Sequence, residues 1–110
     1  MITQEDLDRI SDRKVYVMEA GQTKDIFIAT GGNTKDNIIY FLSVLVCYGD
    51  SEIFYLGKDV DETSPYFGLY ISCTFNKIRK PTFKEYLMFR KAMKENKVSY
   101  NRKTKEVKKL

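Results

Sequence analysis

Basic side chains that could hold an anionic partner are concentrated in the last third of the chain. Residues 77–110 carry thirteen lysines and arginines against three acidic residues, whereas residues 1–76 carry six against twelve. A segment of such positive charge attracts anions and speeds their association. We therefore predict that an anionic partner binds through basic residues of this segment, among them Arg79, Lys80, Arg102, Lys103 and Lys105. The alternative is a solvated tail that only keeps the protein soluble.

A second group of candidate binding residues lies on one predicted strand. Apolar and polar residues alternate from Phe67 to Phe75, which is the pattern of a strand with one buried face. The pattern places Phe67, Leu69, Ile71, Cys73 and Phe75 in the core. The opposite face would carry Tyr70, Ser72, Thr74 and Asn76. Such a face could stack a nucleobase or hold a phosphate, and it is also the ordinary wet face of an antiparallel sheet.

Two further basic residues belong to a predicted helix near the C-terminus. Thr82 begins a capping box, and the pattern after it predicts a helix over Phe83–Asn96. Its expected core arc is formed by Phe83, Tyr86, Leu87, Phe89 and Met93. Arg90 and Lys94 fall inside this arc. Arg90 would therefore reach solvent past the core, pair with Glu85 or Asp61, or face a ligand cleft.

The chain offers little of the usual equipment for catalysis. It has no histidine, and Cys47 and Cys73 lie in apolar runs, where a thiol is a poor nucleophile. Gly31–Lys35 is rich in glycine but lacks the spacing of a phosphate-binding loop. We expect no metal and no cofactor. The enzymatic alternative is a small metal-dependent, nucleotide-handling enzyme built from Asp61, Glu62, Tyr70 and Arg90.

The elements that would position these residues follow from local patterns. Thr3 caps a helix predicted over Gln4–Asp12. Strands are predicted at Val15–Ala20, Asp25–Ala29, Glu52–Leu56 and Val98–Tyr100. The apolar run Ile38–Tyr48 has the length of a helix, yet its β-branched and aromatic residues favour a strand. Both interpretations of this run stay open from the sequence.

These elements predict an α+β fold in one domain that covers residues 1–110. Its sheet is an antiparallel meander of about five strands, with a short N-terminal helix and a C-terminal helix packed on one face. Residues 101–110 are expected to form a basic, mobile tail. The sequence has no secretory signal pattern and no apolar run long enough to span a bilayer, so we expect a cytoplasmic protein with no membrane partner.

The function that this pattern favours is stoichiometric binding rather than catalysis. We expect an anionic partner, either nucleic acid or a phosphate-bearing nucleotide. The overall character is that of a small accessory protein of a phage or mobile element, which would act in the host cytoplasm. The alternative is a protein–protein inhibitor of the anti-defence type, such as an anti-CRISPR protein, that binds an acidic protein surface. Met88 would be its apolar anchor, or the contact in a homo-oligomer.

Overall fold

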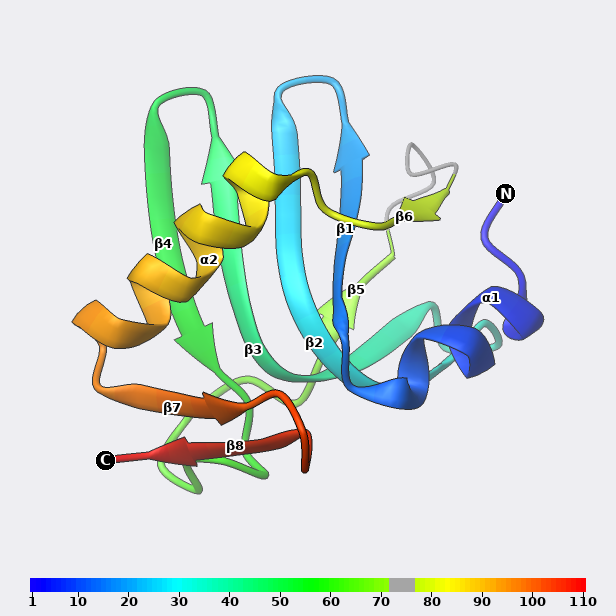
Figure 1. Cartoon of the computed structure of the whole chain (residues 1–110). Coiled ribbons are helices and arrows are strands. Elements are labelled where there is room, and N and C mark those ends of the chain that lie inside the picture. The colour runs from blue at the N-terminus through cyan, green and yellow to red at the C-terminus, as the bar shows by residue number, and fades with distance from the viewer. Residues whose placement is uncertain (72–76) are drawn as a thin grey trace.

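The computed structural model of the chain is an α+β fold built on one antiparallel sheet (Figure 1). It describes residues 1–71 and 77–110. The helices are α1 (Gln4–Arg9), continued by a 3-10 turn at Ile10–Asp12, and α2 (Phe83–Glu95). The strands are β1 (Val15–Ala20), β2 (Thr23–Asn33), β3 (Ile38–Tyr48), β4 (Ser51–Leu56), β5 (Leu69–Tyr70), β6 (Ile78–Arg79), β7 (Val98–Asn101) and β8 (Glu106–Lys109). The predicted fold class is confirmed.

The main sheet has the strand order β4-β3-β2-β1-β6, with β5 added at one end of β3. Each pair of neighbouring strands is antiparallel. Gly21 and Gly49 begin the two tight turns of the meander, and both have positive φ values, +58° and +57°. Glycine takes this conformation without the steric cost of a Cβ, which explains why the hairpins turn at these residues. Ile38–Tyr48 is a strand, as its β-branched residues indicate.

The loop predicted at Gly31–Lys35 is displaced, because β2 continues through Asn33. The pairing of β2 with β3 shifts register around Ala29 and Gly31, which allows both long strands to bend toward α1 (Figure 1). A Cβ on Gly32 would lie 2.8 Å from the Ile38 carbonyl oxygen and 3.0 Å from a Leu7 methyl group. This glycine therefore serves close packing between α1 and the sheet.

The two faces of the sheet are covered by different helices. Leu7 and Ile10 of the N-terminal helical segment pack on one face, in a cluster with Phe27 of β2. Phe89 and Met93 of α2 pack on the other face, in a second cluster. Both helices begin with a capping box, at Thr3 and Thr82. No helix in the described part of the chain is long and apolar enough to cross a membrane.

The predicted core arc of α2 is wrong by about a quarter turn. Phe83 and Leu87 are exposed, at 78% and 50% of their surface, whereas the buried residues of the helix are Glu85, Phe89, Ala92 and Met93. Met88 also packs against the core, so it is not the free anchor that a protein-binding surface would need. The apolar pattern was misleading because a charged residue, Glu85 in the first turn, belongs to the buried face.

The strand predicted over Phe67–Phe75 is described only in part. Within the described residues, Leu69 and Tyr70 form β5 and pair with Ile39 and Ile38. Phe67 is 74% exposed, against the prediction, and lies under the ammonium group of Lys58, with 4.7 Å between the nitrogen and the ring centre. Cys73 and Phe75 lie outside the described residues.

The chain after α2 forms a hairpin that lies beyond the end of that helix (Figure 1). The sequence predicted its first strand, β7, but gave no signal for β8, which lies within the segment expected to be a tail. Val98 and Tyr100 face the core. The Tyr100 hydroxyl donates a hydrogen bond to the carbonyl oxygen of Arg13, at 2.7 Å, which ties the hairpin to the start of β1.

Asp25 on β2 is a buried carboxyl group with an incomplete set of contacts. Only 4% of its surface is exposed, and its Oδ1 atom has no hydrogen-bond partner among the described residues. Burial raises its pKa from 3.8 to about 6. The folded state therefore holds the proton more tightly than the unfolded state, and ionisation between pH 4 and 6 lowers stability.

The substitution Asp25→Asn should raise the free energy of unfolding at pH 7 by about 1–2 kcal/mol, because it removes the buried charge and keeps the shape. The gain should shrink toward pH 4, where both states of the wild type are becoming protonated. Urea unfolding at the two pH values measures this difference. A gain that is the same at both values would show that the charge of Asp25 is not its cause.

Candidate functional site

A cavity of about 360 Å³ lies where the start of β1, the segment before α2, and the β7–β8 hairpin meet. We call it the basic pocket. It is lined by Lys14, Val15, Tyr16, Lys80, Pro81, Tyr86, Tyr100, Arg102 and Lys105. Its volume lies within the range of about 300–1,000 Å³ that is common for small-molecule sites. It combines basic residues with tyrosines.

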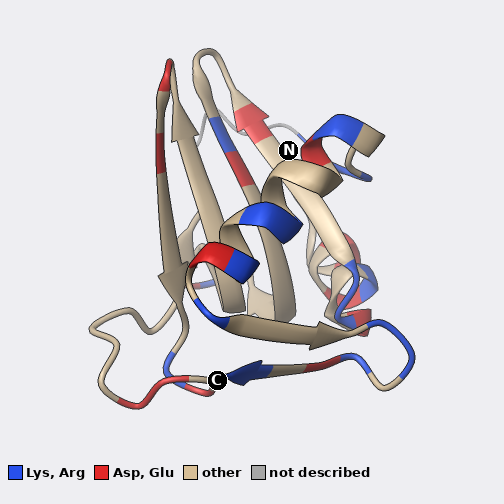
Figure 2. Ribbon diagram, turned by 60° about the vertical axis from the view of Figure 1, so that its left-hand side comes forward, with Lys and Arg blue, Asp and Glu red and all other residues tan. Residues whose placement is uncertain are grey.

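Four cationic side chains line the basic pocket: Lys14, Lys80, Arg102 and Lys105. Within residues 1–71 and 77–110, none of the four forms an ion pair, and no aspartate or glutamate lines the cavity. Figure 2 shows basic segments on α2 and at the turn between β7 and β8, on the side of the molecule that α2 covers. The nearest carboxylate in the hydrogen-bond network, Asp12, is engaged with the Tyr16 hydroxyl and the Lys14 backbone N–H. Positive charges brought together with no carboxylate in the cavity wall favour an anion.

The turn of the hairpin fixes Arg102 and Lys105. The side-chain oxygen of Asn101 accepts hydrogen bonds from the backbone N–H groups of Lys103 and Thr104, at 2.9 and 3.1 Å. The backbone N–H of Lys105 donates to the Asn101 carbonyl oxygen at 2.7 Å. Asparagine side chains commonly fold a turn in this way. The two cations of the turn therefore stand on an ordered backbone.

The tyrosines of the basic pocket are held in place by polar contacts. The Tyr16 hydroxyl donates to Asp12 at 2.9 Å, and burial, together with this hydrogen bond, raises the pKa of Tyr16 to about 12. The Arg90 guanidinium lies 5.3 Å from the ring centre of Tyr100 and 6.0 Å from that of Tyr86. It also donates to the Tyr86 hydroxyl at 3.3 Å. Arg90 thus braces two aromatic residues of the pocket.

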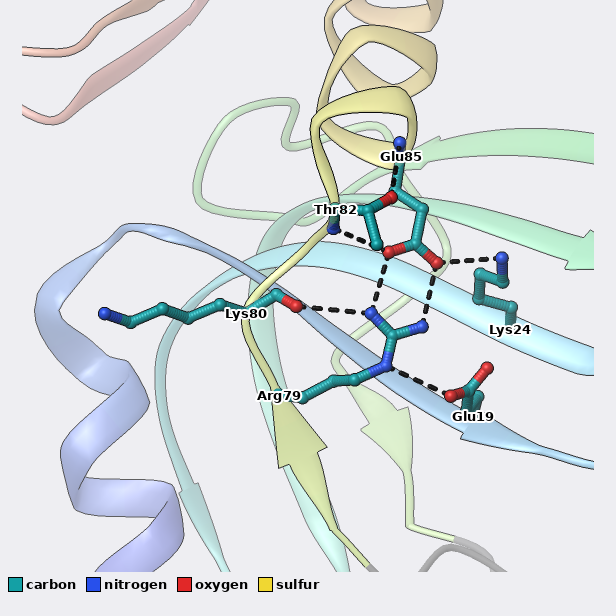
Figure 3. Close-up of polar contacts among 6 residues, drawn as sticks. All are labelled: Glu19, Lys24, Arg79, Lys80, Thr82 and Glu85. Atoms are coloured by element: carbon teal, nitrogen blue, oxygen red, sulfur yellow. Dashed lines mark hydrogen bonds and ion pairs between the residues drawn. The ribbon is translucent and has the colours of Figure 1, made fainter.

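An ion-pair cluster around the buried Glu85 positions the segment that carries Lys80 (Figure 3). Arg79 binds Glu85 through two nitrogens, at 2.7 and 2.9 Å, and donates to Glu19 at 3.0 Å. Lys24 lies 2.8 Å from the second oxygen of Glu85. Hydrogen bonds from Arg79 are the main reason that the pKa of Glu85 lies well below its usual range.

The same cluster joins three parts of the chain. Glu85 accepts from the backbone N–H of Thr82 at 2.8 Å, and an Arg79 nitrogen donates to the Lys80 carbonyl oxygen at 3.2 Å. The side chain of Lys80 extends away from the cluster (Figure 3). Arg79 therefore holds the β6–α2 connection in shape while its own guanidinium is occupied by carboxylates.

The structure brings together some of the predicted site residues and separates others. Lys80, Arg102 and Lys105 share the basic pocket, and Arg90 contacts two of its tyrosines. Lys94 lines a neighbouring cavity, and Lys103 is exposed in the hairpin turn without lining either cavity. Tyr70 is exposed on β5 and lines neither of them, and Ser72, Thr74 and Asn76 lie outside the described residues.

Lys14, Tyr86 and Tyr100 were missed by the sequence analysis. The one available signal was the basic pair Arg13–Lys14 directly before a strand in an otherwise acidic part of the chain. The sequence pattern assigned Tyr86 to the core arc of the helix and Tyr100 to a short strand. Neither assignment reveals that the hairpin after the helix contacts the start of β1. Sites assembled from three distant segments leave little trace in local sequence.

Asp61, one of the two carboxylates proposed for an enzyme, is engaged in other contacts. Asp61 accepts from the Thr63 hydroxyl at 2.6 Å and from the Lys109 ammonium at 2.9 Å. These hydrogen bonds lower its pKa to about 2. In the part of the chain that the structure describes, no group of three histidine, cysteine or acidic residues could hold a metal ion.

Comparison with protein-family models, with curated proteins and with solved structures gave no match to this chain.

Proposed function

We propose that the protein is a stoichiometric binder of a phosphate-bearing partner, a nucleotide or nucleic acid, and that the basic pocket is its contact site. The observation that carries the proposal is the convergence of Lys14, Lys80, Arg102 and Lys105 on one cavity that also has tyrosine in its wall. Cations supply the attraction to phosphate, and an aromatic ring offers a surface to a nucleobase.

The size and recess of the basic pocket support a ligand of about one nucleotide unit at this place. Tyr86 is half-buried, so part of its side chain is open to solvent, whereas Tyr100 is buried beneath Arg90. A base would therefore meet Tyr86 while its phosphate meets the surrounding cations. Arginine at position 102 can bind two phosphate oxygens at once, which lysine cannot.

The first test is a titration of the protein with a 5′-phosphorylated thymidine dinucleotide at 20 and at 200 mM salt. Binding is monitored by calorimetry or NMR. Saturable binding is expected, and its affinity should fall with salt. Two phosphate contacts predict a slope of log K against log salt of about −1.4. Failure to bind at 20 mM salt, or an affinity that is independent of salt, would contradict the proposal.

A further inference from the structure

A second cavity, of about 450 Å³, lies along the later turns of α2, the start of β7 and the C-terminal residue. We call it the helix pocket. It is lined by Leu87, Arg90, Lys91, Met93, Lys94, Lys97, Val98 and Leu110. Four of these residues are basic and four are apolar, and no acidic residue of the described chain lines it. Lys91 has one distant ion pair with Glu95, at 3.9 Å.

One side chain lies between the two cavities. Arg90 lines the helix pocket, and its guanidinium contacts the rings of Tyr86 and Tyr100, which line the basic pocket. A ligand that leaves the basic pocket across Arg90 therefore enters the helix pocket without meeting a carboxylate in the wall of either cavity. Lysine and arginine positions occur both on α2 and at the turn of the hairpin (Figure 2).

Two lysines of this path have an unusual backbone conformation. Lys97 and Lys105 have positive φ values, 58° and 62°, where glycine or asparagine would be less strained. Lys97 lines the helix pocket and Lys105 lines the basic pocket. These two turns therefore each place a cationic side chain in the wall of a cavity.

We propose that the two pockets form one continuous track for a single-stranded nucleic acid, an inference that rests on the proposed function of the basic pocket. A strand presents both phosphates and bases, and the two cavities together present both cationic and apolar or aromatic side chains. The exposed apolar residues Leu87 and Leu110 offer the bases of a strand an apolar surface. A duplex would keep its bases stacked away from both cavities.

The test compares the 5′-phosphorylated dinucleotide with (dT)8 on the full-length protein. The octanucleotide should bind about 30-fold more tightly at equal salt, because bases beyond the first pocket gain contacts. The double variant Lys94→Gln with Lys97→Gln should lose most of this gain and leave dinucleotide binding unchanged. The matched control, Lys35→Gln with Lys58→Gln, removes the same charge outside both pockets and should keep the gain.

The outcomes separate this inference from the proposed function. If the dinucleotide binds and (dT)8 binds no more tightly, the proposed track is wrong, whereas the basic pocket remains the proposed contact site. If the dinucleotide does not bind, the proposed function itself fails. An octaglutamate peptide that competes as well as (dT)8 would point to an acidic protein partner, and tighter binding of an eight-base-pair duplex would exclude a single-strand track. Both results would overturn the inference.

Discussion

Replacing Glu85 with glutamine is expected to lower the free energy of unfolding by about 2–4 kcal/mol at pH 7. The Glu85 side chain is 6% exposed and meets Arg79 and Lys24 at 2.7 and 2.8 Å. Glutamine would leave two cations beside a buried neutral group, although it can still accept from the backbone N–H of Thr82. Urea unfolding followed by circular dichroism measures the loss.

The pH dependence of the stability difference between wild type and Glu85→Gln tests whether the charge of Glu85 causes the loss of stability. Because the folded-state pKa of Glu85 lies below its ordinary value of 4.5, its contribution to stability is complete above that pH and is lost as pH falls. The difference between wild type and Glu85→Gln should therefore shrink at pH 3. Glu19→Gln is the matched control, since Glu19 is exposed and makes one contact with Arg79, and it should cost below about 1 kcal/mol. An equal loss in both variants would contradict the central role of Glu85.

Removing two cations of the basic pocket should have the largest effect on binding. The double variant Lys14→Gln with Arg102→Gln is expected to lower the affinity for the phosphorylated dinucleotide by about 100-fold. The reason is that each hydrogen bond to a charged group contributes about 1.5 kcal/mol or more to binding. Each lost phosphate contact should also flatten the salt slope by about 0.7. Calorimetry measures both quantities.

The folded state should survive this change, because neither residue has an ion pair within the described part of the chain. The melting temperature of the double variant should therefore stay within about 2 °C of the wild type. The control variant Lys35→Gln with Lys58→Gln has the same net charge and should bind nearly as well as the wild type. If both double variants weaken binding equally, only the net charge matters and the basic pocket is not the site.

Local rules predicted much of the fold. The glycines at the meander turns, the threonine caps at Thr3 and Thr82, and the β-branched residues of Ile38–Tyr48 each act within a few neighbours, so their effects can be read from sequence. The buried face of α2 could not be predicted, because it depends on Glu85 meeting Arg79 across a loop. That contact is a property of the tertiary structure.

The candidate site was predicted only in its charge. The basic composition of residues 77–110 drew attention to Lys80, Arg102 and Lys105, and the structure places all three in one pocket. Lys14 lies in the acidic part of the sequence, and nothing local reveals that Tyr100 of the β7–β8 hairpin contacts the start of β1. The role in a phage or mobile element, the anti-defence alternative and the cytoplasmic location stay predictions.

The most direct test of the basic pocket is a map of backbone amide chemical shifts during titration with the phosphorylated dinucleotide. If the basic pocket is the binding site, the largest saturable shifts fall in three separated segments, 14–16, 80–86 and 100–105, with one shared dissociation constant. Shifts that are largest around Lys35 or Lys58, or that grow linearly without saturation at any residue, would contradict it.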